Sequence, residues 1–98
     1  MTEEPPLLSI LVPVFNERET VERAIAAMLE TDLPGLRREL VIVDDGSLDG
    51  TRELLEHREW PEEVRVFFHA ANRGKGAAVR TSLSHARGGY ATVMDADL

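Results

Sequence analysis

The feature that most constrains the fold is a regular alternation between two hydrophobic periods. Short apolar runs, rich in β-branched residues, cover residues 7–15, 40–43, 64–68 and 90–94, and segments with helical spacing separate them. Runs of this kind are typical of strands buried on both faces. The helical connections have the length that parallel strands need, and such crossovers are right-handed. The sequence therefore predicts an α/β fold, a parallel sheet flanked by helices on both faces.

Each helix has a predicted start and a predicted apolar side. Asn16 is expected to be the N-cap of the first helix, with Glu19 completing a capping box. The second helix is expected over about 49–59 and the third over 74–86. Helical spacing predicts that one side of the third helix carries its apolar residues, namely Val79, Leu83 and Ala86.

Composition excludes several classes of function. Eighteen acidic against eleven basic residues give the 98-residue chain a net charge of −7, which disfavours electrostatic binding to nucleic acid. The absence of cysteine excludes disulfides, thiolate nucleophiles and cysteine-ligated zinc. No apolar run approaches the roughly twenty residues of a membrane span, and the acidic start lacks the basic region of a signal peptide. The expected location is the cytoplasm, and the sequence indicates no oligomeric state.

Polar side chains follow each predicted strand. They are Asn16 and Glu17 after the first strand, Asp44 and Asp45 after the second, residues 69–75 after the third, and Asp95 and Asp97 after the fourth. Ligands of open parallel sheets bind at the carboxyl ends of the strands. Any one of these clusters is explained as well by helix capping or an Asx turn. Four clusters at one edge of one sheet favour a shared binding site.

Two of the clusters suggest chemistry. Two carboxylates at Asp95 and Asp97, two residues apart at a strand end, suit Mg²⁺ or Mn²⁺ held jointly with a substrate's phosphates. Glycines around Lys75, the only lysine, open the third helix, where backbone amides and the ammonium group favour a phosphate. The alternative, a tight turn with a solvated lysine, explains this second segment equally well. Neither a P-loop nor a dinucleotide fingerprint is present.

Four motifs, in order, carry a resemblance to a known family. They are residues 12–17 (VPVFNE), 43–51 (VDDGSLDGT), 72–80 (NRGKGAAVR) and 94–98 (MDADL). Together they resemble the family 2 glycosyltransferases, and most closely the polyprenyl-phosphate (dolichol-phosphate) mannosyl- and glucosyltransferases. The resemblance implies a Rossmann-like GT-A fold that binds a nucleotide-diphosphate sugar. It makes residues 1–7 a tail and residues 8–98 the N-terminal, donor-binding half of a longer catalytic domain, truncated after the fourth strand.

The resemblance also implies a role for each matching position. The donor's base and ribose would lie against Pro13, Phe15 and Glu17, with phenylalanine in place of a more usual tyrosine. The backbone of Val43 and the carboxylate of Asp45 would contact the base, while Asp44 would orient the turn. Asp95 and Asp97 would hold the divalent ion and the ribose-diphosphate, with Ala96 packed beside them. Together with Lys75, these residues make up the expected donor site.

The implied activity is metal-assisted, inverting transfer of a sugar from a donor of the UDP-glucose or GDP-mannose type. The resemblance implies a polyprenyl phosphate acceptor, which would place the full-length protein at the cytoplasmic face of a membrane. The catalytic residues are then expected beyond Leu98. A fragment that binds the donor without turnover is the alternative. A receiver-like signalling domain is disfavoured, because its acidic pair would follow the first strand, where this chain has Asn16 and Glu17.

Overall fold

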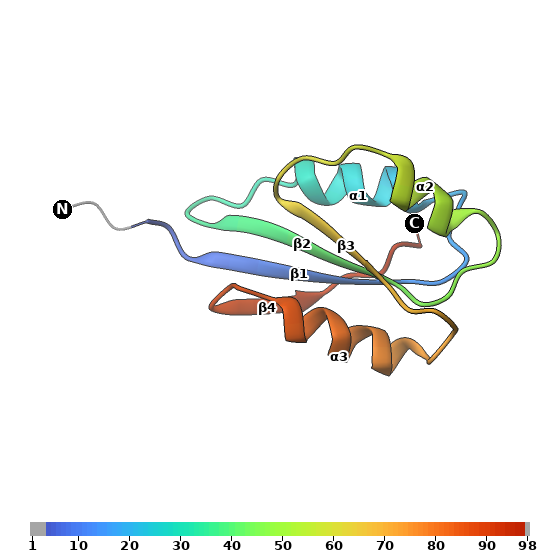
Figure 1. Ribbon diagram of the computed structural model, residues 1–98. Coiled ribbons are helices and arrows are strands. Elements are labelled where there is room, and N and C mark those ends of the chain that lie inside the picture. The colour runs from blue at the N-terminus through green and yellow to red at the C-terminus, as the bar shows by residue number, and fades with distance from the viewer. Residues whose placement is uncertain (1–3, 98) are drawn as a thin grey trace.

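The computed structural model describes residues 4–97, which contain a four-stranded parallel sheet in the order β3-β2-β1-β4 (Figure 1). The strands are β1 (Leu7–Val14), β2 (Arg37–Asp44), β3 (Val64–Phe68) and β4 (Tyr90–Val93). Their β-branched residues favour extended strands, and four successive residues of β2, Leu40 to Val43, have no exposed surface. All four strands end at the same edge of the sheet, which brings the segments that follow them together.

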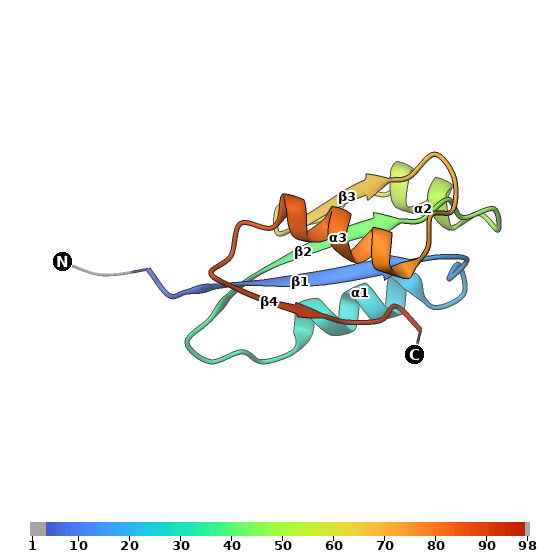
Figure 2. The ribbon, with the colours of Figure 1, turned by 90° about the horizontal axis from the view of Figure 1, so that it is seen from below.

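Helices cover both faces of this sheet. The helices α1 (Val21–Glu30) and α2 (Thr51–His57) lie on one face, and α3 (Lys75–His85) lies on the other (Figures 1 and 2). The main core forms between the sheet and the first pair, where Ile25, Ile42 and Leu55 are almost completely buried. Burying each such side chain contributes about 1.5–3 kcal/mol. The structure confirms the predicted α/β fold.

The predicted start of the first helix is wrong. Helix α1 begins at Val21 after Thr20, and Asn16 has a positive φ of 50° instead of capping the helix. Asparagine tolerates this left-handed conformation better than most residues. The side-chain oxygen of Asn16 accepts a hydrogen bond from the Leu48 amide at 2.9 Å, so the residue joins two loops. Residues 17–20 form a turn that precedes the helix.

The buried side of α3 also differs from the prediction. Ala77, Ala78 and Ser82 face the protein interior, whereas Leu83 is 55% exposed. Small side chains let the helix lie close against β1 and β2, with which it makes most of its contacts. The structure therefore places a surface of small residues, and not the larger apolar ones, between this helix and the sheet.

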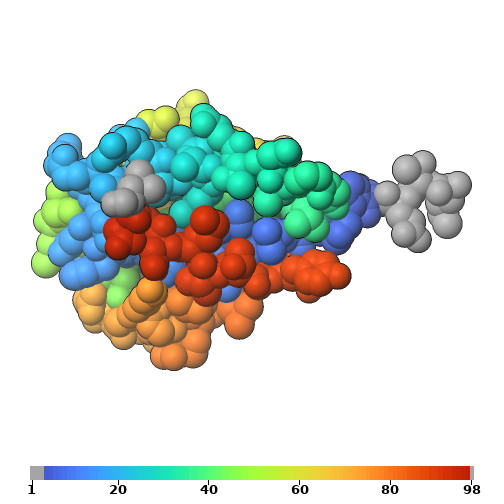
Figure 3. All heavy atoms as spheres, turned by 180° about the vertical axis from the view of Figure 1, so that it is seen from behind, coloured from blue at the N-terminus to red at the C-terminus, as the bar shows by residue number. Residues whose placement is uncertain are grey.

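The fourth strand lies at the edge of the sheet beside β1. All four of its residues are exposed, and Figure 3 shows this red segment on the surface between α1 and α3. Of the tail predicted over residues 1–7, residues 1–3 lie outside the described part, residues 4–6 have no regular structure, and Leu7 already belongs to β1.

Candidate functional site

The segments after β1, β2, β3 and β4 surround one pocket of about 280 Å³. Four carboxylates line it, contributed by Glu17 after β1, Asp45 after β2, and Asp95 and Asp97 after β4. Eight of the nine residues expected at the donor site are among the lining residues, which are Pro13, Val14, Phe15, Glu17, Asp45, Asn72, Lys75, Ala78, Asp95, Ala96 and Asp97. The ninth, Val43, is fully buried within β2 and does not line the pocket.

The loop after β1 is fixed by contacts with two other segments. The Glu17 amide donates to the Thr51 hydroxyl at 3.0 Å, which ties this loop to the start of α2. The Thr20 hydroxyl lies 3.2 Å from the Glu17 carboxylate and 2.9 Å from the Ala96 carbonyl oxygen. Thr20 therefore links the loop after β1 to the Asp-Ala-Asp segment, and Ala96 is buried beside it.

The two neighbouring aspartates after β2 have different roles. Asp44 has no exposed surface, and its carboxylate accepts the Ser47 amide at 3.1 Å and the Ser47 hydroxyl at 2.6 Å. These bonds, from the residue three positions further along the chain, hold the turn after β2, so the expectation that Asp44 orients the turn is confirmed. The Ser47 hydroxyl in turn accepts the Asn16 amide at 2.9 Å.

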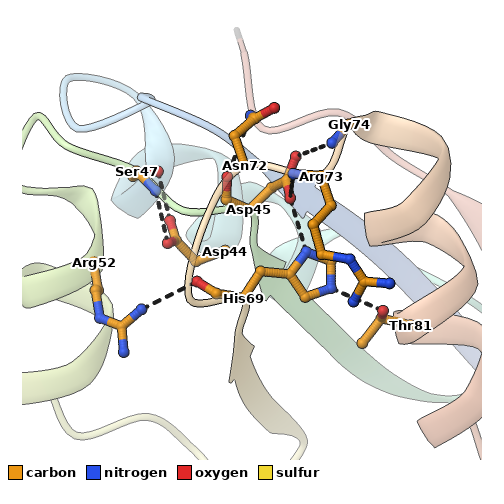
Figure 4. A network of polar contacts seen from close by, with 9 residues as sticks. All are labelled: Asp44, Asp45, Ser47, Arg52, His69, Asn72, Arg73, Gly74 and Thr81. Carbon is orange, nitrogen blue, oxygen red and sulfur yellow. Dashed lines mark hydrogen bonds and ion pairs between the residues drawn. The ribbon is translucent and has the colours of Figure 1, made fainter.

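Asp45 joins the strand edge to the loop that opens α3. Its carboxylate accepts the His69 ring Nδ1–H at 2.7 Å and the amides of Arg73 at 2.8 Å and Gly74 at 2.9 Å (Figure 4). Burial raises the pKa of Asp45, but these hydrogen bonds outweigh it and hold the pKa below the ordinary aspartate value. The carboxylate is therefore ionised at neutral pH, with about one of its four acceptor positions left over.

Gly46 allows the loop after β2 to approach the loop after β3. Its φ is +75°, a left-handed conformation, and a Cβ atom here would lie 2.4 Å from the Asn72 backbone nitrogen. Any larger residue would push apart the two loops that bring Asp45 and Asn72 to the pocket.

At the open side of the pocket, Lys75 pairs with Asp95. The Lys75 Nζ lies 2.7 Å from Asp95 Oδ1, and both side chains are more than half exposed. The hydrogen bond and charge of Asp95 raise the pKa of Lys75, so the ammonium remains charged. An exposed pair of this kind contributes little stability, and an incoming phosphate or cation can exchange with either partner.

The residues fit a divalent ion that is shared with a ligand. Within residues 4–97, no group of three or more His, Cys, Asp or Glu side chains could enclose a metal. Two carboxylates, at Asp95 and Asp97, do line the pocket. Mg²⁺ is commonly bound through one or two carboxylates together with substrate phosphates and water. The pocket can therefore hold such an ion with a phosphorylated ligand, and less well without one.

Sequence reasoning missed several residues of this arrangement. Val14, Asn72 and Ala78 line the pocket, although Asn72 and Ala78 belong to a motif from which only Lys75 was assigned a role. His69 belongs to the polar cluster predicted over residues 69–75, but the sequence indicates no contact for its side chain. Nothing in the sequence indicated Thr20, because its two contacts depend on the loop after β1 folding against the Asp-Ala-Asp segment.

Comparison with known proteins identifies the family. The family model described as glycosyl transferase family 2 matches residues 9–98. The chain belongs to glycosyl transferase family 2. A curated relative of this family 2 chain, the dolichol-phosphate mannosyltransferase of Pyrococcus furiosus, is 35% identical over 91 residues. The match covers 93% of the chain and 26% of the relative, so the chain spans about a quarter of that enzyme's length.

Solved structures share the fold. The mannosyltransferase PcManGT from Pyrobaculum calidifontis, in complex with GDP-Man and Mn²⁺, is 31% identical with a TM-score of 0.76, covering 98% of this family 2 chain and 28% of its own. S. aureus TarS 1-349 in complex with UDP is 26% identical with a TM-score of 0.79, covering 92% and 27% respectively. The fold of the chain is the Rossmann-like GT-A fold of these glycosyltransferases.

Proposed function

We propose that the pocket at the carboxyl ends of the strands binds a nucleotide-diphosphate sugar, and that the full-length protein transfers the sugar to an acceptor. The observation that carries this proposal is the meeting of four carboxylates from three strand ends in one pocket, in a chain that belongs to glycosyl transferase family 2. Residues 8–98 are then the donor-binding part of the domain. The pocket volume is near the lower end for small-molecule sites and suits a nucleotide.

Each side of the pocket suits one part of the donor. Base and ribose are assigned to the segment with Pro13, Phe15 and Glu17, where Phe15 is 43% exposed and available for contact. The carboxylate of Asp45 and the backbone of Val43 are assigned to the base. The diphosphate is assigned to Lys75, near the N-terminus of α3, and to Asp95 and Asp97 through a divalent ion, with Ala96 packed beside them. The complex of PcManGT with GDP-Man and Mn²⁺ supports binding of such a donor together with a divalent ion.

The chemistry follows from the charge on the leaving group. Breaking the sugar–phosphate bond builds negative charge on the nucleoside diphosphate, and groups that compensate it act most strongly in the transition state. The Lys75 ammonium and the amides that begin α3 supply part of this compensation. Mg²⁺ or Mn²⁺, when bound, supplies Lewis-acid stabilisation of the phosphate oxygens. Inverting displacement is the proposed course of the reaction.

The proposed acceptor is a polyprenyl phosphate, supported by the dolichol-phosphate mannosyltransferase among the relatives. A phosphate monoester has its second pKa at about 6 and is already largely ionised at neutral pH, so the attacking oxygen needs little general-base help. In residues 4–97, no helix is long and apolar enough to cross a bilayer. We place the reaction at the cytoplasmic face of the membrane, where such an acceptor would meet a soluble donor.

Calorimetric titration of UDP-glucose and GDP-mannose with Mn²⁺, on the 98-residue chain and on the full-length protein, tests donor binding. Asp95→Ala and Asp97→Ala are each expected to weaken the donor at least about tenfold. Even the loss of an outer-shell partner costs about 10–100-fold in metal affinity, and these carboxylates are assigned as direct ligands. Asp32→Ala is the matched control, because Asp32 is an exposed acidic residue that does not line the pocket.

Failure of the full-length protein to bind either donor would contradict the proposal, as would binding unaffected by both pocket substitutions. Radiolabelled sugar transfer to a lipid phosphate then distinguishes two forms of the function. Transfer by the full-length protein but not by residues 1–98 assigns the chain donor binding without turnover. Transfer by the 98-residue chain alone would show that the described pocket suffices for catalysis.

A further inference from the structure

A hydrogen-bonded chain of three side chains lies behind the pocket. His69 Nδ1 is 2.7 Å from Asp45 Oδ1, and His69 Nε2 is 2.8 Å from the Thr81 hydroxyl on α3 (Figure 4). The His69 and Asp45 side chains are only 5% and 3% exposed. Of these three residues, only Asp45 lines the pocket.

The imidazole ring has one possible orientation in this setting. The His69 amide donates to the Asp44 carbonyl at 2.8 Å and the His69 carbonyl accepts from Arg52 at 3.2 Å, so the backbone is fixed on both sides. Because the ionised Asp45 carboxylate only accepts hydrogen bonds, Nδ1 must carry a proton. The Thr81 hydroxyl can donate to a neutral Nε2 or accept from a protonated one. Both ring nitrogens are therefore engaged, and the ring cannot turn without losing a bond.

This chain of contacts has the same order as a hydrolase triad, an acid, a histidine and a hydroxyl, but it does not serve as one. Thr81 lies within α3 and does not line the pocket, and His69 is buried. A nucleophile needs space for a substrate beside its oxygen. The end of this chain of contacts that lines the pocket is the carboxylate of Asp45, so the arrangement acts on that carboxylate.

We infer that His69 is a positioning residue for nucleotide binding, which holds Asp45 through its Nδ1–H so that the remaining acceptor position of the carboxylate faces the base. The inference rests on the proposed function. Of the three donors to the Asp45 carboxylate among the described residues, two are backbone amides, of Arg73 and Gly74, and His69 supplies the only side-chain donor. A base with an N–H group directed at this acceptor, as uracil and guanine have, is the ligand the arrangement suits.

Two amide substitutions test the hydrogen bonds of the two ring nitrogens separately. In His69→Asn the amide nitrogen is as many bonds from Cα as Nδ1 is, so it can still donate to Asp45. In His69→Gln the amide lies at the distance of Nε2, so it reaches Thr81 and leaves Asp45 without its side-chain donor. Both replacements remove the imidazole and put an amide in its place, which makes each the control for the other. Thr81→Val removes the partner of Nε2 and leaves the bond to Asp45 intact.

The measurement is calorimetric binding of UDP and GDP with Mn²⁺ to the full-length protein, with binding of Mn²⁺ alone and the thermal unfolding midpoint as parallel readouts. We expect His69→Asn and Thr81→Val to bind within about threefold of the wild type, and His69→Gln to bind about tenfold or more weakly, the loss expected for a hydrogen bond to a charged group. Mn²⁺ binding should be the same in all four proteins. In a transfer assay, the Gln variant should show the change in the KM of the donor and not in kcat.

A purely structural role for His69 predicts something different. Nucleotide binding would then fall in step with the unfolding midpoint, and His69→Gln would weaken binding no more than His69→Asn or Thr81→Val does. That result would overturn the inference, as would unchanged binding in every variant. If the wild type binds the nucleotides in the same experiment, the proposed function stands while the role of His69 falls. If the wild type binds neither UDP nor GDP, both fall together.

Discussion

Replacing Asp45 with asparagine should destabilise the protein by about 2–4 kcal/mol and abolish most nucleotide binding, whereas the same replacement at Asp44 should cost only about 1 kcal/mol. Both aspartates are buried, and both substitutions remove one negative charge without changing side-chain size. The difference expected between them comes entirely from the hydrogen-bond partners of each carboxylate.

The Asp45 carboxylate accepts from the backbone amides of Arg73 and Gly74, which can only donate, and from the Nδ1–H of His69. An asparagine NH₂ group here would face one of these donors, leaving two buried groups without an acceptor. Asp44 instead accepts from the amide and the hydroxyl of Ser47. A hydroxyl can accept as well as donate, so an asparagine at position 44 keeps a partner for both of its polar atoms.

Urea unfolding followed by circular dichroism measures the two stabilities, and calorimetry measures binding of UDP and GDP with Mn²⁺. Equal destabilisation by the two substitutions would contradict the assignment of hydrogen bonds. Full nucleotide binding by a folded Asp45→Asn protein would remove Asp45 from the donor site.

Gradual loss of wild-type stability is also expected as the pH falls below the ordinary aspartate pKa of about 3.9. The lowered pKa of Asp45 means that its carboxylate stabilises the folded state only while the carboxylate is ionised.

The fold was predictable because its signals are local. Each strand is a continuous apolar run bounded by turn residues, and each helix has its own spacing, so the order of elements follows from short windows of sequence. The bounds of β3 agree with the prediction to the residue. The start of α1 was not predictable in this way, because the conformation of Asn16 depends on its contact with Leu48, 32 residues along the chain.

The candidate site also has a part that could be predicted from the sequence and a part that could not. Glu17, Asp45, Asp95 and Asp97 could be brought to one pocket from sequence because the topology of a parallel sheet places all strand ends at one edge. The partners of Asp45 could not be predicted, since the motif around Lys75 does not show that its amides point back at β2. Likewise, His69 contacts Asp45 across two neighbouring strands and Thr81 across the gap to α3, and no spacing in the sequence encodes either contact.

A second buried carboxylate, at the opposite end of the sheet, should have the other large effect. Glu39→Gln is expected to destabilise the protein by about 2 kcal/mol at neutral pH. The Glu39 carboxylate is 8% exposed and accepts the Ser9 hydroxyl at 2.6 Å, the Arg87 amide at 2.6 Å and the Arg65 guanidinium at 2.8 Å. It thereby ties β1, β2 and β3 to the loop that precedes β4, and glutamine can satisfy only part of this set.

The pKa of Glu39 determines how the stability lost in Glu39→Gln changes with pH. Burial raises the pKa of Glu39, but the bonds from Ser9, Arg87 and Arg65 outweigh burial and hold the pKa below the ordinary glutamate value. A lowered pKa in the folded state means that the stabilisation is fully present above the unfolded pKa, about 4.3, and is lost as the pH falls through the folded value. The glutamine variant cannot titrate at this position, so the stability difference between it and the wild type should shrink as the solution is acidified from pH 7 towards 3.

Glu56→Gln is the matched control, because Glu56 is exposed on α2 and the substitution changes charge and composition identically. Its stability should stay within about 0.5 kcal/mol of the wild type at neutral pH. The difference in unfolding free energy between the two variants no longer contains the contribution of the other carboxylates, Asp45 included, since all three proteins share them. A difference between Glu39→Gln and the wild type that stays constant from pH 7 to 3 would show that the charge of Glu39 does not hold these strands together, and that side-chain packing alone accounts for its burial.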